Sequence, residues 1–291
     1  MKRAMAEVIL MGAVTGAIGA YIVLRGLSFI GDALAHAIFP GIVIAFLLGQ
    51  GIFFGALIFG VLTSVAIGVI ATNQRVKEDS AIGVLFAGTF ALGIVLISSS
   101  KNFTRDLASF LFGNVLGVTT NDFMLSAIVG AIVIVLIALF YRELLITSFD
   151  RAAAQAMGLP VLMLDLLLLV MISLTIVVSL RAVGNILVVA MLVTPAATAR
   201  LLTDRLPVMI LLGSVIGILS GIVGLYVSYY NDVAAGGTIV LVATALFGLA
   251  WLFAPDHGYV MTHLVQRRLA GGAPETTILF ESPEIQTPHE P

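Results

Sequence analysis

The stretch "GLSFIGDALAHAIFPG", residues 26–41, decides how this sequence folds. It belongs to a long apolar run, yet it carries Asp32 and His36, two ionisable side chains four residues apart. A charged side chain near the centre of a lipid bilayer costs at least about 2.5 kcal/mol. The stretch therefore predicts a membrane-spanning helix in which these two side chains have a function.

The rest of the chain has the composition of a polytopic membrane protein. Of its 291 residues, 60% are hydrophobic and 10% are charged, whereas a soluble domain carries about 25% charged residues. The net charge of −2 gives no reason to expect a nucleic-acid partner. The chain has no cysteine, which excludes disulfides and thiolate metal ligands.

Nine segments are long and apolar enough to cross a bilayer, for which about 17–25 residues are needed. A helix satisfies its backbone polar groups within its own segment, so we expect an all-α fold with lipid on its outside. Eight spans, with one partial or re-entrant segment, are the alternative. The nine segments are residues 7–24, 29–49, 51–71, 80–99, 123–146, 161–180, 183–201, 207–229 and 237–254.

The basic residues predict the orientation of the chain. With nine spans, the Lys and Arg residues of 72–79, 142–151, 200–205 and the tail all fall on one side. The positive-inside rule makes that side cytoplasmic. The N-terminus then lies outside, although it begins with the basic "MKR"; eight spans would remove this conflict.

Two stretches are not expected to span the bilayer, and the second of them limits the transmembrane permease domain to residues 1–255. Residues 100–122 are long and mixed in polarity, which favours a short helix at the outer surface. Residues 256–291 are polar, acidic and rich in proline towards their end, which is typical of a disordered cytoplasmic tail.

Asp32 and His36 have the spacing and chemistry of a metal site. Residues at i and i+4 share one helix face. A carboxylate oxygen and an imidazole nitrogen suit Mn²⁺, Zn²⁺ or Fe²⁺. Two ligands are too few for a tight site, but a symmetric homodimer would bring four. A buried Asp–His hydrogen bond that fixes helix packing is one alternative, and a proton relay is another.

Two prolines are candidate breaks in the helices that would form the pore. Pro40 follows His36 by one turn and should kink or break its helix, either to shape the pore or only for packing. Pro195 is a second candidate break, within residues 185–200. We expect the polar Asn185 of that segment to hydrogen-bond a neighbouring helix rather than a ligand.

A cytoplasmic segment, "ITSFDRAAAQAMGLP" (146–160), has the pattern of a short helix. Asp150, Ala154 and Gly158 repeat every four residues and so share one face. Asp150 is favoured near a helix N-terminus, while Gly158 and the following proline end the helix. Small residues allow close approach by another protein; an ordinary helical linker is the alternative.

Four stretches together resemble the membrane permease subunits of bacterial ABC importers for manganese, zinc and iron. They are "LRGLSFIGDALAHAIFPG", "LFGNVLGV", "LLITSFDRAAAQAMGLP" and "ILVVAMLVTPAATAR", and the similarity runs in order from about residue 7 to 255. It implies a fold like that of type II importers. It also implies a homodimer that works with a separate cytoplasmic ATPase and an extracytoplasmic metal-binding protein.

The resemblance also implies roles for particular residues. Asp32 and His36 match the motif implicated in metal passage. The segment at about 148–159 matches the part that couples to the ATPase, which implies a docking role for Phe149, Asp150, Ala154 and Gly158. Residues 100–122 would face the binding protein. The forms "HAIFPG" and "SFDRAAAQAMG" are closer to the manganese-type members of the family.

These observations predict a multi-pass permease of the bacterial cytoplasmic membrane that imports a divalent transition metal, with Mn²⁺ expected and Zn²⁺ or Fe²⁺ as alternatives. The metal is cargo, and no permanently bound cofactor is expected. The sequence has no G-x-x-x-x-G-K-[ST] phosphate loop, so we expect a transport subunit with ATP hydrolysis on another chain, not an enzyme. A secondary transporter driven by protons or sodium through Asp32 is the main alternative, and a non-transporting membrane receptor is another.

Overall fold

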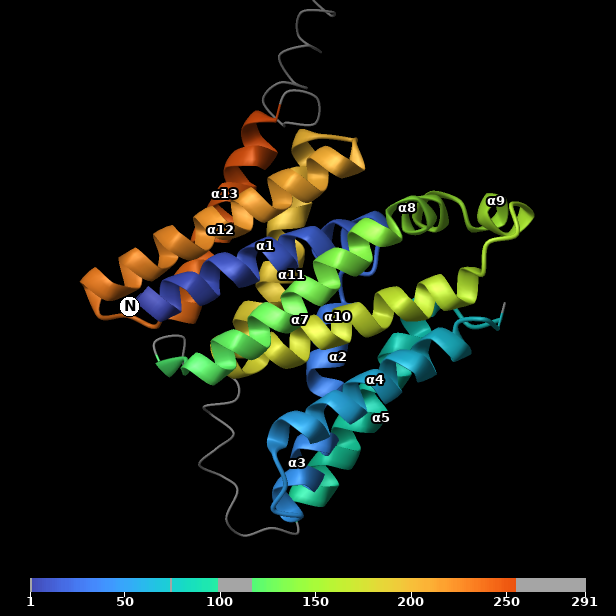
Figure 1. Ribbon diagram of the computed structural model, residues 1–291, viewed down its shortest axis with the longest axis horizontal. Helices are drawn as coiled ribbons and strands as arrows, with labels where there is room; N and C mark the ends of the chain where they lie inside the picture. Colours follow the sequence, from blue (N-terminus) through green and yellow to red (C-terminus); the bar gives the residue numbers. More distant parts are fainter. Residues whose placement is uncertain (1, 74, 99–116, 255–291) are drawn as a thin grey trace, which may run out of the picture.

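The computed structural model describes residues 2–73, 75–98 and 117–254, and in this part of the chain all regular structure is helical (Figure 1). The helices are α1 (Lys2–Leu24), α2 (Ile30–Ala37), α3 (Phe39–Leu47), α4 (Ile52–Ile70), α5 (Glu78–Ser98), α7 (Thr120–Leu139), α8 (Tyr141–Phe149), α9 (Arg151–Ala156), α10 (Val161–Val183), α11 (Asn185–Leu202), α12 (Leu206–Asn231) and α13 (Ala235–Phe253).

The prediction of nine spans is confirmed for the described residues, where nine helical segments are long and apolar enough to cross a membrane. Helices α2 and α3 together make one of these segments, and α8 and α9 are too short to span. Residues 100–116 of the predicted outer segment, and the predicted tail 256–291, lie outside the described residues.

One predicted span has different bounds in the structure. The sequence predicts a single helix over 123–146, but α7 ends at Leu139 and a separate helix, α8, begins at Tyr141. Phe140 between them leaves helical geometry, with φ −100° and ψ 21°. The exposed Arg142 follows at once. The chain therefore changes direction where its apolar run gives way to polar residues.

The break predicted at Pro40 is confirmed. Helix α2 ends at Ala37, α3 begins at Phe39, and Pro40 is the second residue of α3. Proline has no N–H to donate to the carbonyl of His36, four residues earlier. In the first turn of a helix this loss is harmless, because the N–H groups there have no partner within the helix. The span is thus built from two short helices.

The break predicted at Pro195 is wrong. Helix α11 runs without interruption from Asn185 to Leu202, with the buried Pro195 inside it. Proline removes one backbone hydrogen bond, but in a membrane an open helix would leave several more backbone groups without partners. The neighbouring turn also gains a bond, because Thr198 Oγ1 donates to the carbonyl of Thr194 at 2.7 Å. Continuing the helix is therefore the less costly arrangement.

Pairs of glycines bring the backbones of α1 and α12 into direct contact. A methyl group on Gly12 would lie 2.7 Å from the backbone of Gly217, and one on Gly16 would lie 2.5 Å from the backbone of Gly213. Both helices thus have the small-xxx-small spacing that lets membrane helices approach closely. Helix α1 is consequently one of the most buried spans.

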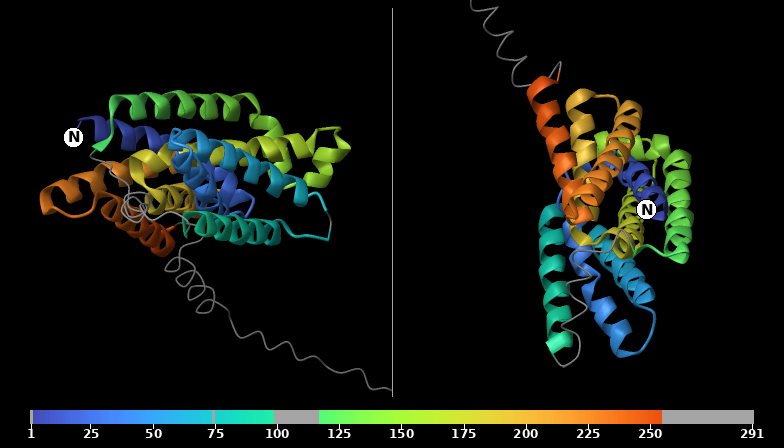
Figure 2. Two further views of the ribbon diagram at one scale, coloured as in Figure 1. Left: turned by 90° about the horizontal axis from the view of Figure 1, so that it is seen from below. Right: turned by 90° about the vertical axis from the view of Figure 1, so that its left-hand side faces the viewer.

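Helix α2 lies in the middle of the molecule. It packs against α4 and α5 and also against α10 and α11. The views in Figures 1 and 2 show α3, α4 and α5 as one group of helices, well separated from α12 and α13. The residues of α2 are therefore placed where two groups of helices meet.

The two ends of the bundle can be assigned relative to each other. The N-terminus lies at the end opposite α8 and α9 (Figure 1). Arg25, just after α1, donates a hydrogen bond to Ser148 on α8, which places the end of α1 beside α8. An outer N-terminus therefore follows if α8 and α9 are cytoplasmic, despite the basic "MKR".

Candidate functional site

Asp32 and His36 face each other along the eight-residue helix α2. Asp32 lies in its first turn and His36 in its last turn, where the helix dipole favours an acid and a base respectively. The distance from Asp32 Oδ1 to His36 Nε2 is 3.5 Å, and the two side chains are 49% and 25% exposed. This distance exceeds a normal hydrogen bond, and the exposure differs from that of a buried packing pair.

The ring of His36 lies against an aromatic wall. Phe86 and Phe90 of α5 meet the imidazole edge-on, with ring centroids 5.6 Å and 5.2 Å away. These two phenylalanines also stack on each other. The wall restricts the orientation of the imidazole, so that its Nε2 atom is directed to the polar side of the site.

Asn185, the first residue of α11, completes this polar side. Its Nδ2 lies 3.5 Å from His36 Nε2, the same nitrogen that faces Asp32. Asn185 is buried, and its Oδ1 has no hydrogen-bond partner in the described part of the chain. An amide oxygen is a ligand that Mn²⁺ accepts. Because rotation of the amide would bring Oδ1 to the site, Asn185 can act as a further oxygen ligand.

The sequence interpretation missed this position of Asn185, since it assigned the residue to helix packing. The available signal is the Gly-Asn pair at residues 184–185. Gly184 has φ +79° and ends α10, so that α11 begins directly at Asn185. A polar residue at the first position of a spanning helix, next to a glycine turn, is therefore a candidate ligand to be considered together with the Asp32–His36 pair.

A single chain supplies only part of a metal site. Within the described residues there is no group of three or more His, Asp, Glu or Cys side chains that could hold a metal ion. One chain thus offers Asp32, His36 and the amide of Asn185 in one place. Such a set fits an ion that is held briefly, or a site completed by a second copy.

The short helix predicted in 146–160 is present as α9. Asp150 caps its N-terminus, with the side chain accepting a hydrogen bond from the Ala153 N–H at 2.9 Å. Gly158 has φ +77° and ends it. The N–H groups of Gly158 and Leu159 donate back to Gln155 and Ala154, at 2.9 Å and 3.1 Å. Both predicted end signals thus act as expected.

The predicted docking face of α9 needs a correction. Ala154 is fully buried, because α9 packs this side against α8 and α10. The side chains of Phe149 and Met157, at the two ends of α9, are exposed instead. Any partner of α9 therefore meets these two apolar side chains and the exposed Asp150 and Gly158, and it does not touch Ala154.

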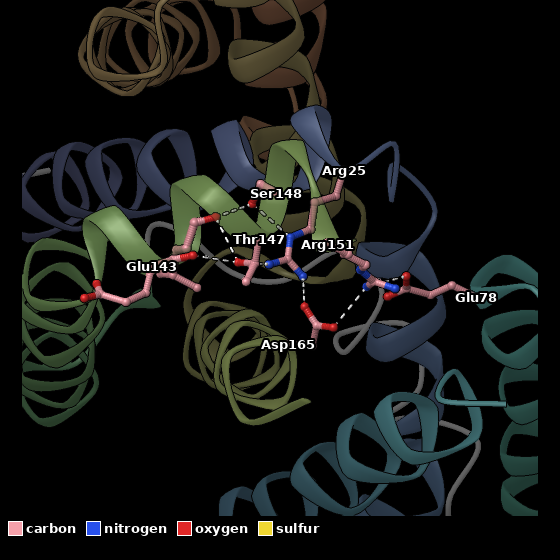
Figure 3. A network of polar contacts seen from close by, with 8 residues as sticks. Arg25, Glu78, Glu143, Thr147, Ser148, Arg151 and Asp165 are labelled. Atoms are coloured by element: carbon pink, nitrogen blue, oxygen red, sulfur yellow. Dashed lines mark hydrogen bonds and ion pairs between the residues drawn. The ribbon is translucent and has the colours of Figure 1, made fainter. Parts of the chain in front are cut away.

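A network of charged side chains lies beside α9 (Figure 3). Asp165 of α10 pairs with both Arg25 and Arg151. Arg151 also pairs with Glu78, the first residue of α5, at 3.0 Å. The sequence interpretation gave Asp165 no role, because the partners of this residue come from distant parts of the chain.

Comparison with known proteins agrees with this architecture. The model of the ABC 3 transport family matches residues 1–254. The chain belongs to the ABC 3 transport family. It is 50% identical to the manganese transport system membrane protein MntC of Halalkalibacterium halodurans, over 89% of this chain and 88% of the relative.

Two further matches extend over most of this permease. The manganese import system permease protein ScaB of Streptococcus gordonii is 44% identical, over 89% of this chain and 93% of the relative. The structure of PsaBC from Streptococcus pneumoniae in complex with Fab matches with a TM-score of 0.79 at 43% identity, over 90% of this chain and 94% of that one.

These findings confirm the predicted family, the all-α permease fold and the multi-pass membrane location. The predicted function, a permease subunit of an ATP-binding-cassette metal importer, is confirmed at the level of the family. The alternative of a secondary transporter finds no support in the comparisons.

Proposed function

We propose that this permease carries Mn²⁺ into the cytoplasm, and that Asp32, His36 and Asn185 hold the ion on its way. The observation that carries the proposal is the position of His36 Nε2, which lies 3.5 Å from both the Asp32 carboxylate and the Asn185 amide. The proposal is supported by the manganese transport named for MntC and ScaB. Zn²⁺ and Fe²⁺ are compatible with the same ligand types.

The site is suited to transport rather than storage. A transported ion must bind well enough to enter and weakly enough to leave. Three ligands from one chain leave positions for water, so release requires few bonds to break. The aromatic wall of Phe86 and Phe90 offers the ion no ligand on the side of α5.

We also propose that the permease acts as a homodimer with α2 of each copy facing the pore. On the isolated chain α2 has an open side: Phe29, just before it, is 83% exposed, and the Asp32 side chain is half exposed. Two copies related by a twofold axis at this side would bring together two sets of Asp32 and His36.

We assign the two remaining partners, the ATPase and the metal-binding protein, to opposite ends of the bundle. A separate ATPase would dock at α9, on the surface that exposes Phe149, Asp150, Met157 and Gly158. An extracytoplasmic metal-binding protein would deliver the ion at the opposite end, where the N-terminus lies (Figure 1). Binding and hydrolysis of ATP would then alternate access to the site between these two ends.

Uptake by reconstituted vesicles tests this function. The permease, its ATPase and the binding protein are reconstituted, and uptake of Mn²⁺ is measured with ATP and with a non-hydrolysable ATP analogue. We expect uptake only with ATP, and weaker competition by Zn²⁺ and Fe²⁺ than by unlabelled Mn²⁺. Equal uptake without hydrolysis would contradict ATP-driven transport, and stronger competition by Zn²⁺ would contradict the assignment of manganese.

A further inference from the structure

Asp165 forms ion pairs with two arginines, Arg25 and Arg151, that are far apart in the sequence. One carboxylate oxygen, Oδ1, accepts from Arg25, and the other, Oδ2, lies 3.1 Å from Arg151 Nη2 (Figure 3). The Arg25 and Asp165 side chains are almost completely buried. Ion pairs in such surroundings are screened much less by solvent and salt than exposed pairs. The carboxylate of Asp165 therefore bridges the two arginines, and its bond to Arg25 is better protected from solvent than its bond to the half-exposed Arg151.

The Arg151 side of this link belongs to α9. Arg151 is the first residue of α9, directly after the capping residue Asp150. Its guanidinium also pairs with Glu78, where α5 begins, at 3.0 Å. Helix α5 carries Phe86 and Phe90 against His36. Through these ion pairs, a displacement of α9 would be transmitted to α10 and to α5, the helix that forms the aromatic wall of the metal site.

The Arg25 side of the link belongs to the connection between α1 and α2. Arg25 Nε donates to Ser148 at 3.0 Å, and its Nη2 donates to Thr147 at 3.1 Å, both on α8. All three guanidinium nitrogens are therefore held by α8 and α10. Helix α2 begins only five residues later, at Ile30. The three bonds of Arg25 therefore restrict the position of the start of α2, the helix that carries Asp32.

We infer that Asp165 is a positioning residue for transport, which connects the movement of α9 to α2 and α5 at the metal site. The inference rests on the proposed docking of the ATPase at α9. Without the link, the ATPase would still dock and hydrolyse ATP, but less of its movement would reach the metal site. The expected defect is a loss of coupling rather than a loss of folding or of docking.

Arg151→Gln is the sharpest test, since it cuts α9 from Asp165 and Glu78 and leaves the buried Arg25–Asp165 pair intact. The Arg151 side chain is 44% exposed, so the variant should fold. Arg200→Gln is a matched control. Arg200 lies in the last turn of α11, is 39% exposed, and pairs at 3.0 Å with Asp204, a residue that is not part of this network.

The quantity to measure is Mn²⁺ transported per ATP hydrolysed, in vesicles with the ATPase and the binding protein. We expect Arg151→Gln to lower this ratio at least about fivefold with hydrolysis within about twofold of wild type, and Arg151→Lys to recover much of it. Arg200→Gln should match wild type. An unchanged ratio in Arg151→Gln would overturn the inference, as would a parallel fall in uptake and hydrolysis, which indicates lost docking or folding. Absence of ATP-driven uptake in wild type would instead refute the proposed function.

Discussion

Replacing Gly158 with alanine tests whether the backbone after α9 has to adopt a left-handed conformation. Gly158 has φ +77°, a region in which an L-residue costs about 1–2 kcal/mol. A methyl group there would meet no atom within 4 Å, so no steric clash adds to this cost. We therefore expect Gly158→Ala to destabilise the last turn of α9 by about 1 kcal/mol, which is about fivefold in an equilibrium constant.

Gly158→Asn separates this conformational effect from the size of the side chain. Asparagine is larger than alanine but adopts the left-handed region more readily. A conformational origin therefore predicts a larger defect for alanine, whereas a steric origin at the docking surface predicts a larger defect for asparagine.

Two assays report the outcome. The backbone amides of residues 158 and 159 donate to the carbonyls of Gln155 and Ala154. Their hydrogen exchange should accelerate about fivefold in Gly158→Ala and less in Gly158→Asn. The affinity of the permease for its ATPase should fall in the same order. The reasoning is refuted if asparagine is as harmful as alanine, or if alanine changes neither exchange nor affinity.

Three other substitutions test separate parts of the structure. Asn185→Ala removes a proposed ligand and should raise the Mn²⁺ concentration for half-maximal uptake about tenfold, equivalent to about 1.4 kcal/mol. An unchanged concentration would show that Asn185 serves helix packing and does not bind the ion. Gly16→Leu should lower stability in detergent by about 1–3 kcal/mol because it forces α1 away from Gly213, while Gly83→Leu, at a position with open space, should not; equal losses would contradict the role given to the α1–α12 contact. Pro195→Ala should retain uptake and raise thermal stability, because it restores a backbone bond inside a continuous helix; a loss of stability would show that proline is needed there.

The sequence predicted those features that local chemistry determines. The spans follow from the length of their apolar runs, since a bilayer admits little else than helices. Asp32 and His36 stand out because ionisable residues are rare within such runs. The ends of α9 were predicted from Asp150 and Gly158, because a capping carboxylate and a left-handed glycine act within one turn of the helix.

The errors arose where neighbouring helices decide the outcome. Pro195 does not break α11, because the cost of an open helix in an apolar environment exceeds that of one missing hydrogen bond. Ala154 was placed on a docking face from its spacing and from the resemblance of its segment to the one that couples to the ATPase. Spacing shows which residues share a face, but the packing of α9 on α8 and α10 decides which face is covered.

The polar contacts at both sites depend on residues far apart in the sequence. Asn185 reaches His36 across 149 positions, and Arg25 reaches Asp165 across 140. No period or motif in the sequence connects such pairs. They become visible only once the helices are packed together.

Uptake by Asp32→Ala and His36→Ala tests the central claim most directly. Each variant is reconstituted with the ATPase and the binding protein, and ATP hydrolysis serves as the measure of assembly. Asp204→Ala, which removes an exposed carboxylate that pairs with Arg200, is the control. The account predicts that both site variants assemble and lose Mn²⁺ uptake while Asp204→Ala retains it. Uptake at the wild-type level in both site variants would contradict the assignment of Asp32 and His36 as the pair that holds the metal.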